Sequence, residues 1–399
     1  MRKTVSYILV LNKLKVAFEQ AALLSLCHFI PKDKNLWVFG CVRGYAEGCA
    51  AIIKIADREK KTRNIWLYRS KSEKTLLEAY GHEHYKLKSI KGYWYCLRAN
   101  LAFIAYGFND LNGTAIFRSK IINVWHGTPL KTIYFDSPQL GSKVGLNQLK
   151  NIAKHLFTKR IQLFPVSSEL SKKRIEKAFR LRTGVAQITG EPRTDKIFSS
   201  ITESSSDNSL PLSLLKSLGP EKLILYAPTW RPGHPPTTNQ QEILHLIDFL
   251  ECHDKYLILR PHPRDENNHL LKVKHERIIK FLQKDYQDIY NYLYLFGSLI
   301  TDYSSIAIDF SITKRPIYFL AQDTDDYVQK QGLYESYDTF TCANWSSDWR
   351  SLIDTLVTEK YSSPKGLQSS SELFRRYHVF NDGQASRRTY EICLRLTET

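Results

Sequence analysis

Phe296-Gly-Ser-Leu-Ile-Thr-Asp-Tyr-Ser-Ser-Ile-Ala-Ile-Asp-Phe310 changes its hydrophobic periodicity midway, and its most polar residues stand at the change. Residues 299–301 end a short apolar run typical of a buried strand, whereas Ile306 and Phe310 restart the pattern at helical spacing. Residues 302–305 therefore form a strand-to-helix turn. Because a helix start presents backbone N–H groups and the positive end of its dipole, this turn is a candidate phosphate cradle. An ordinary capped helix is the alternative.

A second apolar run, at residues 316–320, completes a βαβ unit, the building block of open parallel sheets. Short apolar runs alternate with helical segments through most of the chain. In such sheets, ligands bind at the carboxyl ends of the strands. The other predicted strands are residues 36–40, 64–68, 101–106, 121–125, 162–166 and 185–189 in the first half, and 223–227, 256–260, 293–296 and 298–300 in the second.

The length of the chain predicts two domains, because 399 residues exceed the ~250–300 of a usual single core. Residues 199–209 are rich in Ser, Asp and Asn, and the prolines that follow bracket a short helix, which indicates a linker. We predict an α/β protein with two Rossmann-like open parallel-sheet domains facing a central cleft. The first domain covers residues 1–205 and begins with a helical segment at 1–30, the linker covers 206–220, and the second domain covers 221–399.

The formal net charge of +17 predicts acidic partners, which are nucleic acid, anionic lipid head groups or phosphorylated substrates. The seven cysteines show no CxxC pair and no zinc-site spacing, which favours reduced thiols in a cytoplasmic protein. No small-residue cleavage site follows the basic start of the chain, and the apolar run at residues 20–30 is shorter than the ~18 residues of a membrane span. We therefore do not expect an integral membrane protein.

A histidine follows the predicted strand at residues 121–125, in Trp125-His-Gly-Thr-Pro-Leu-Lys131. The glycine and proline of this stretch indicate a turn, so His126 lies at a strand end. An imidazole at this place can accept the proton of a hydroxyl nucleophile near neutral pH, and Lys131 can bind a phosphate. A capping or packing histidine is the alternative.

Two stretches in the second half repeat this pattern. Arg260-Pro-His-Pro-Arg264 places His262 after a strand, and Arg and His donors there suit the charge of a phosphate. Ala227-Pro-Thr-Trp-Arg231 follows another strand and adds a hydroxyl, an aromatic platform and a guanidinium, for which a surface ion pair is the alternative. Because all these side chains follow strands in both halves, together they predict one cleft.

Two further motifs carry less functional information. Thr189-Gly-Glu-Pro-Arg-Thr-Asp195 is a strand-end turn that we interpret as structural. Asp323-Thr-Asp-Asp326 contains a DxD pattern of the kind that binds Mg²⁺ with a nucleotide, but so short an acidic pattern occurs often by chance. We predict no metal site.

Four motifs in this order and spacing resemble the CDP-glycerol glycerophosphotransferase family of teichoic acid and capsule synthesis. They are Trp125-His-Gly-Thr-Pro-Leu-Lys131, Ala227-Pro-Thr-Trp-Arg231, Arg260-Pro-His-Pro263 and Thr301-Asp-Tyr-Ser-Ser305. The resemblance covers residues 35–390 and includes Asp382-Gly-Gln-Ala-Ser386. Thr194 is a departure, since family members often have Asn before the Asp of this turn.

The resemblance implies a GT-B arrangement and the transfer of glycerol phosphate or ribitol phosphate from a CDP conjugate, with release of CMP. The acceptor is a hydroxyl of a lipid-linked molecule or a polysaccharide in cell-envelope polymer synthesis. The resemblance implies that the first domain contacts the acceptor and the membrane. The second domain binds the CDP donor. No cofactor and no nucleic acid are implied. The choice of alditol, the help of a divalent metal and the oligomeric state stay open.

The resemblance also assigns roles to single residues. His126 matches the candidate general base, and His262 is a second catalytic candidate that contacts the donor phosphates. The other candidates are Arg231, Arg260, Asp302, Ser304 and Ser305 for the donor phosphates, and Gly127, Thr128, Lys131 and Thr229 for further substrate contacts.

Two other functions stay open. A GT-B glycosyltransferase that uses a nucleotide sugar would share the fold and the phosphate cradle, although the paired histidine motifs argue against it. A basic nucleic-acid-binding protein would share the positive charge, but no RRM, KH or helix-turn-helix signature is present.

A basic amphipathic helix is predicted at residues 146–160. Its apolar stripe consists of Leu146, Leu149, Ile152, Ala153 and Leu156, and its cations are Lys150, Lys154, Lys159 and Arg160. With the basic run at residues 172–174, these cations predict peripheral binding to the anionic inner face of the cell membrane. Packing of the stripe against the sheet is the alternative.

Overall fold

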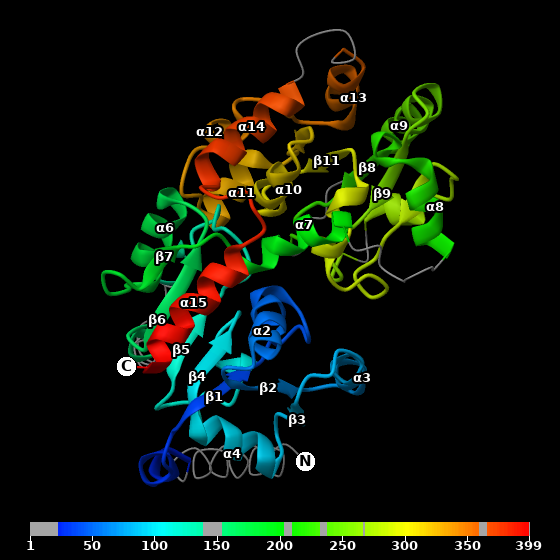
Figure 1. The fold of residues 1–399 in the computed structure, drawn as a ribbon. Coiled ribbons are helices and arrows are strands. Elements are labelled where there is room, and N and C mark those ends of the chain that lie inside the picture. The colour runs from blue at the N-terminus through cyan, green and yellow to red at the C-terminus, as the bar shows by residue number, and fades with distance from the viewer. Residues whose placement is uncertain are drawn as a thin grey trace, which may run out of the picture.

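The chain folds into two lobes (Figure 1). The computed structural model describes residues 23–138, 154–202, 210–231, 238–265, 268–358 and 365–398. Each lobe contains one sheet, and all strand pairs of both sheets are parallel. The prediction of two open parallel sheets in an α/β protein is therefore confirmed. Within the described ranges, no helix is long and apolar enough to cross a membrane.

The sheet of the first lobe has the strand order β3-β2-β1-β4-β5-β6-β7. Trp37 and Phe39 of its central strand face one apolar core, whereas Leu36 and Val38 face another. Both faces of the sheet are thus covered, as is usual for parallel sheets. The strands are β1 (Asp33–Phe39), β2 (Arg63–Tyr68), β3 (His84–Lys86), β4 (Ala99–Ile104), β5 (Lys120–Asn123), β6 (Ile161–Val166) and β7 (Ala186–Ile188).

The sheet of the second lobe has the order β10-β9-β8-β11-β12-β13. The strand predicted at residues 293–296 is wrong, because Leu293–Leu295 forms a 3-10 turn whose leucines fill the core just before the chain enters β11. The strands are β8 (Leu223–Tyr226), β9 (Tyr256–Leu259), β10 (Ile278–Lys280), β11 (Ser298–Thr301), β12 (Ile317–Leu320) and β13 (Trp345–Ser346).

Helices connect the strands, and several begin at residues that suit an N-cap. The side chains of Ser70, Ser89, Ser168 and Asn239 each accept a backbone N–H from the first turn of their helix. The helices are α2 (Glu47–Glu59), α3 (Lys71–Ala79), α4 (Ile90–Arg98), α6 (Glu169–Phe179), α7 (Asp195–Thr202), α8 (Leu210–Leu218), α9 (Gln240–Cys252), α10 (Ile306–Phe310), α11 (Thr324–Gln331), α12 (Tyr337–Thr341), α13 (Trp349–Thr358) and α14 (Lys365–Tyr377).

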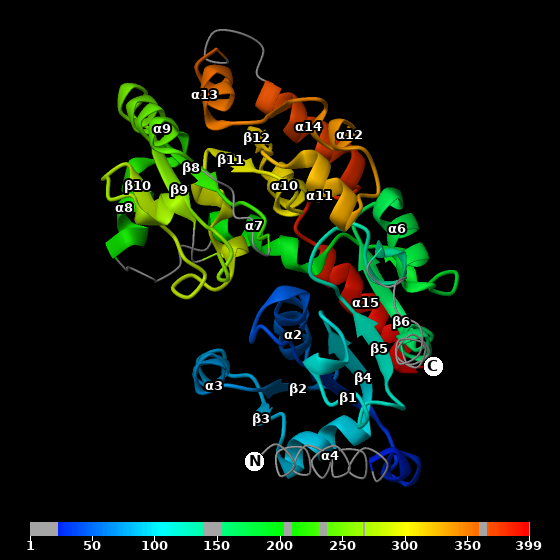
Figure 2. The same ribbon diagram turned by 180° about the vertical axis from the view of Figure 1, so that it is seen from behind.

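The last helix, α15 (Ala385–Glu398), returns to the first lobe, as Figures 1 and 2 show from opposite sides. The indole N–H of Trp37 donates to Thr397 Oγ1 over 3.0 Å, and Tyr390 lies in the same core as Trp37. The carboxylate of Asp195 accepts the first two backbone N–H groups of α15. This packing departs from the expected grouping of residues 221–399, because the apolar face of α15 completes the core of the first sheet.

Buried ion pairs join the two lobes. Arg193, which follows β7, is 1% exposed and pairs with Glu191 of its own turn and with Asp309 of α10 over 2.9 Å. The hydroxyl of Tyr290 also donates to Asp309 over 2.7 Å. The turn at residues 189–195, interpreted as structural, thus connects the first lobe to the helix that follows the strand-to-helix turn of the second.

Candidate active site

A cavity of about 390 Å³ lies between the lobes where strands of both sheets end. Its lining comes from the chain after β5 in the first lobe and after β8, β9 and β11 in the second. The cleft predicted from strand-end motifs therefore exists. The lining residues are Trp125, His126, Gly127, Thr128, Pro129, Leu130, Lys131, Ile133, Pro228, Thr229, Trp230, His262, Tyr303, Ser304 and Ser305.

His126 is held so that one ring nitrogen remains an acceptor. Its Nδ1 lies 3.0 Å from the carbonyl oxygen of Ala105, and since a carbonyl only accepts, Nδ1 carries the proton. The imidazole is stacked on the Tyr106 ring and lies against Trp125, both with centroids 4.0 Å away. Burial lowers the pKa of His126 to about 4. At neutral pH the ring is uncharged, with Nε2 able to accept a proton.

His262 shows the opposite arrangement. The backbone N–H of Arg264 donates to its Nδ1 over 3.1 Å, which leaves the proton on Nε2. Its ring packs against Trp230 at 5.7 Å. Burial and the nearby Arg43 and Arg264 lower the pKa of His262. This side chain therefore brings a neutral N–H donor to the cavity wall.

The two lobes approach each other closely at Gly127. Its φ is +156°, and a Cβ atom there would lie 2.9 Å from Ser305 Oγ, so a side chain would displace the serine of the opposite lobe. Close by, Thr132 N donates to Gly332 O and Tyr334 N donates to Leu130 O, both over 3.0 Å. These bonds fix the His126 loop to the second lobe.

Lys131 brings a positive charge to the same cavity. Burial lowers its pKa to about 8, and the carboxylate of Asp302 opposes this shift. Its Nζ lies 5.3 Å from the centre of the Tyr327 ring. A buried ammonium with so little compensation is suited to an anionic ligand.

Asp302 and Arg231 form the frame behind the cavity wall and do not line it. The Asp302 carboxylate accepts the backbone N–H of Thr229 over 2.8 Å and pairs with Arg231 over 2.9 Å. Arg231 also pairs with Asp323 over 2.6 Å. The sequence left a surface ion pair open for Arg231, but its side chain is buried in the structure. Asp323 belongs to the DxD motif, and no group of three metal-ligating side chains occurs among the residues that the structure describes.

Thr229 and Thr128 differ in how their hydroxyls are bound. Thr229 Oγ1 is buried and has no hydrogen-bond partner within the described residues, although its side chain lines the cavity. Thr128 Oγ1 donates to Glu191 over 2.5 Å. The Thr229 hydroxyl can therefore bind a ligand, whereas the Thr128 hydroxyl is already used inside the protein.

Of the remaining candidates for phosphate binding, two line the cavity and one is bound to protein atoms instead. Ser304 and Ser305 line the cavity, and Ser305 is the N-cap residue of α10 without a side-chain capping bond. Arg260 does not line it, because its guanidinium donates to the carbonyl oxygens of Phe281 and Gln287, each over 3.3 Å. Burial lowers the pKa of Arg260 to about 10. The structure thus gathers eight of the eleven predicted site residues in one cavity.

Tyr106 and Glu47 support His126 from outside the cavity lining, and sequence analysis missed both. The Tyr106 hydroxyl donates to Glu47 Oε1 over 2.9 Å, and its ring covers His126. Burial raises the pKa of Glu47 to about 7. A signal for Tyr106 was present, because it is the last residue of a predicted strand, but its stacking on His126 depends on β4 lying next to β5.

The cations predicted to bind a membrane have mixed surroundings. Lys150 lies outside the described residues, Lys159 is exposed, and Lys154 lies over the Tyr134 ring at 5.4 Å. Arg160 donates to Ser119 O over 3.2 Å and stacks on a phenylalanine. Arg174, in the adjoining basic run, is buried and pairs with Glu335.

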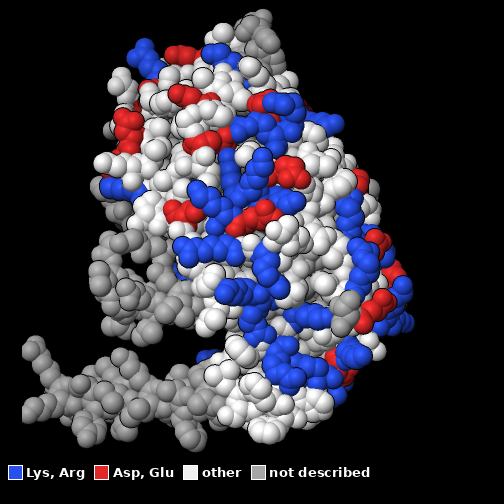
Figure 3. Space-filling model, turned by 90° about the vertical axis from the view of Figure 1, so that its left-hand side faces the viewer, with Lys and Arg blue, Asp and Glu red and all other residues white. Residues whose placement is uncertain are grey.

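The face that carries α6 is nevertheless strongly basic. Figure 3 shows Lys and Arg side chains gathered in a band along this side of the molecule, with acidic side chains interspersed mainly in its upper part. Lys173, Lys177 and Arg180 of α6 and its end are exposed. The net positive charge is thus partly concentrated on one face.

Comparison with known proteins agrees with the resemblance. The teichoic acid ribitol-phosphate polymerase TarK of Staphylococcus aureus is 28% identical over 291 residues, which cover 70% of this chain and 54% of TarK. A teichoic acid glycerol-phosphate transferase of the same organism is 28% identical over 283 residues, covering 68% of this chain and 70% of that protein. The chain therefore spans only about half the length of TarK.

A solved structure has the same fold. The wall teichoic acid polymerase TagF superposes with a TM-score of 0.75 over 100% of this chain and 97% of the TagF chain, at 20% identity. A family match extends over nearly the whole sequence, at residues 22–395. This chain belongs to the CDP-glycerol:poly(glycerophosphate) glycerophosphotransferase family.

Proposed function

We propose that the cleft transfers glycerol phosphate or ribitol phosphate from its CDP conjugate to a hydroxyl of a lipid-linked or polysaccharide acceptor in teichoic acid or related polymer synthesis. Family membership supports the reaction class, and the names of the relatives support both alditols. The observation that carries the proposal is the pairing, in one cavity, of an acceptor nitrogen on His126 with an N–H donor on His262.

In this reaction the acceptor hydroxyl oxygen attacks the β-phosphorus of the CDP-alditol, and His126 Nε2 accepts the hydroxyl proton. A bond forms between the acceptor oxygen and the β-phosphorus, while the bond from this phosphorus to the bridging oxygen breaks. CMP leaves with the bridging oxygen, and the alditol phosphate remains on the acceptor as a phosphodiester. No covalent enzyme intermediate is needed.

Side chains of both lobes stabilise the negative charge of the diphosphate. The direct donors are the His262 N–H, the Lys131 ammonium and the hydroxyls of Thr229, Ser304 and Ser305, all of which line the cavity. For Arg231, Arg260 and Asp302 we infer an indirect role, because their polar groups are bound to protein atoms. The first lobe then holds the acceptor and the second holds the CDP donor.

The acceptor side is proposed to work at the inner face of the cell membrane. Leu156 is 57% exposed and Lys159 is exposed next to it, so this segment offers both apolar and cationic contacts to an anionic surface. We expect binding to anionic vesicles that falls as salt rises and weakens when Lys150, Lys154, Lys159 and Arg160 become Gln. Equal recovery on neutral and anionic vesicles would contradict this proposal.

Release of CMP tests the proposed reaction. Purified protein is incubated with CDP-glycerol, CDP-ribitol or a nucleotide sugar, each with a lipid-linked disaccharide, and the free nucleotide is quantified. We expect CMP from at least one CDP-alditol and no turnover of the nucleotide sugar. Turnover of the nucleotide sugar alone would show that the cleft belongs to a glycosyltransferase.

A further inference from the structure

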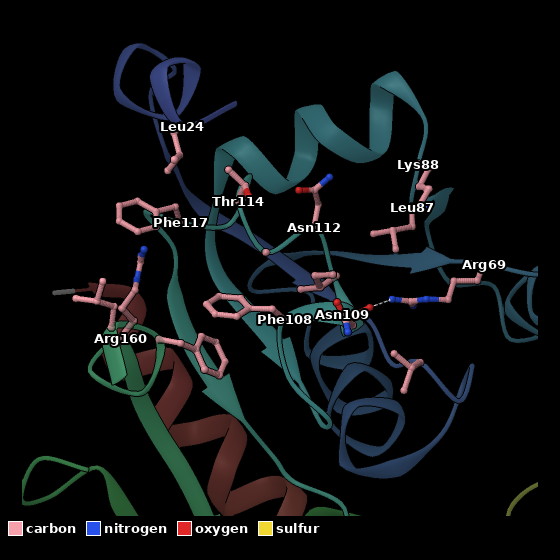
Figure 4. Close-up of a pocket in the computed structure, with 15 residues that line it drawn as sticks. Leu24, Arg69, Leu87, Lys88, Phe108, Asn109, Asn112, Thr114, Phe117 and Arg160 are labelled. Carbon is pink, nitrogen blue, oxygen red and sulfur yellow. Dashed lines mark hydrogen bonds between the residues drawn. The ribbon is translucent and has the colours of Figure 1, made fainter. Parts of the chain in front are cut away.

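A second and larger hollow, of about 770 Å³, lies in the first lobe outside the interlobe cavity (Figure 4). Its walls include the apolar side chains of Leu24, Phe108, Phe117, Leu156 and Phe157. The volume falls within the range of sites that bind small molecules. None of the residues assigned above to phosphoryl transfer lines this apolar groove.

The groove follows one face of the first sheet from end to end. Val42, at one end, lies three residues after β1 and Arg69 directly follows β2, so they mark the carboxyl edge that also carries His126. Arg160, at the other end, stands directly before β6 and marks the amino edge. A long, thin ligand would therefore lie across the sheet, with one end near the edge of the active site.

A short rigid loop connects the groove to the catalytic histidine. Tyr106 is stacked on His126, and Phe108 lines the groove only two residues later, a separation of at most about 7 Å along the chain. Gly107 makes the reversal between them with a φ of +137°. The buried carboxylate of Asp110 accepts the N–H groups of residues 105, 106 and 107 at 2.5 to 2.9 Å. The loop is thus held in place, with Tyr106 against His126 of the active site and Phe108 in the wall of the groove.

The charges of the groove suit an anionic head group. The described residues that line it include Arg69, Lys88 and Arg160 but no Asp or Glu. Arg69 donates to carbonyl oxygens of Cys41, Asn109 and Asp110, one of which is drawn in Figure 4. Lys88 is exposed at the carboxyl edge of the sheet. An apolar channel with cations only at its rim fits a hydrocarbon chain that ends in a phosphate.

Exposed apolar side chains lie on two helical segments that adjoin residues of the groove lining, Leu24 and Lys88. Leu26 and Phe29 are 47% and 83% exposed on the helical segment that carries Leu24. Ile90 and Trp94 of α4 are 90% and 45% exposed. Figures 1 and 2 both place α4 and this first segment at the same end of the molecule. Such a cluster is typical of a surface that meets lipid.

We propose that this groove binds the hydrocarbon chain of the lipid-linked acceptor, with the phosphate of that lipid near Lys88 and the acceptor hydroxyl carried past Tyr106 toward His126. The inference rests on the proposed function, since it specifies the acceptor of the same reaction. The hydrocarbon chain of the acceptor would thus occupy a defined groove on the first lobe. This contact adds to those that the surface cations of residues 154–160 make with the membrane.

Two acceptors that differ only in chain length test the proposal. One is a disaccharide pyrophosphate with a long isoprenoid chain, and the other carries a chain of a few carbons. The rate of CMP release gives kcat/KM for each acceptor with the groove variants Phe117→Gln and Leu156→Gln. Leu244→Gln is the control, because Leu244 is 61% exposed on α9 of the second lobe. We expect the ratio of long-chain to short-chain kcat/KM to fall about tenfold in each groove variant, the loss typical of one apolar contact.

Photolabelling gives a readout that does not need turnover. A long-chain isoprenoid phosphate with a diazirine near the middle of its chain is irradiated with the wild-type protein, and labelled peptides are identified by mass spectrometry. We expect labels within residues 108–117 and 154–160. Labels elsewhere, or an unchanged ratio in both groove variants, would overturn the groove proposal. If neither acceptor yields CMP while these peptides are labelled, the proposed reaction fails and the lipid site stands.

Discussion

The two histidine loops of the cleft have the same sequence pattern but opposite hydrogen bonding. His126 and His262 both follow a parallel strand, and both line one cavity. In the first loop a carbonyl oxygen fixes the proton on Nδ1, whereas in the second a backbone N–H fixes it on Nε2. The backbone around each ring thus determines whether it accepts or donates a proton, and a strand-end histidine motif by itself does not.

The largest effect is expected from His126→Ala, which removes the acceptor nitrogen. Turnover should fall by on the order of 10²–10⁴, the range for loss of a positioned acid–base group. Donor binding should be retained, because the ring is not among the direct donors to the diphosphate. Steady-state kinetics and calorimetric titration with CDP-glycerol measure the two quantities. Turnover close to that of the wild type would remove His126 from the mechanism.

His262→Ala should act mainly on the donor. Loss of one hydrogen bond to a charged phosphate should raise the KM for the CDP-alditol roughly 10- to 100-fold. His262→Gln provides a matched control, since its amide N–H can replace part of this bond. An unchanged KM for the donor combined with a large fall in kcat would contradict the assignment of donor binding to His262 and of proton transfer to His126.

Lys131 gives the comparison a pH signature. Because burial sets its pKa at about 8, its charge is present below this pH and is lost as the pH rises through it. Donor kcat/KM should therefore fall about tenfold for each pH unit above 8. Lys131→Arg should move this decline to higher pH, since a guanidinium keeps its proton. No decline should appear between pH 6 and 7, because the pKa of His126 is about 4.

The smallest effect is expected from Tyr106→Phe. The ring still covers His126, but the hydrogen bond to Glu47 is lost, and turnover should fall only about two- to tenfold. Tyr106→Ala removes the stacked ring as well and should cost more. Equal kinetics of both variants and the wild type would show that this tyrosine does not position the histidine.

Much of the site could be predicted from the sequence, because parallel topology brings strand ends together whatever the loops contain. The period change at residues 296–310 correctly places β11, its turn and α10, and Gly127 does meet Ser305 across the cleft. Apolar periodicity likewise predicts most strands. It fails at residues 293–296, where a buried apolar run is too short to distinguish a strand from a turn.

Other features depend on partners that are distant in sequence. Arg231 and Asp302 resemble phosphate ligands in their motifs, but 71 residues separate them and only the strand order β8-β11 brings them into an ion pair. Arg174 belongs to a basic run, yet Glu335 of the other lobe pairs with it. The return of α15 to the first sheet has no local signal either, since its partner Trp37 is 360 residues away.

The fate of the β-phosphate tests the central claim most directly. CDP-glycerol or CDP-ribitol labelled with ³²P at the β-phosphorus is incubated with the protein and a lipid-linked disaccharide, and the products are separated. We expect the label in the acceptor, unlabelled CMP in solution, and no transfer by His126→Ala. Label that stays with the nucleotide as CDP, with an acceptor that has gained the alditol without phosphate, would contradict phosphoryl transfer in this cleft.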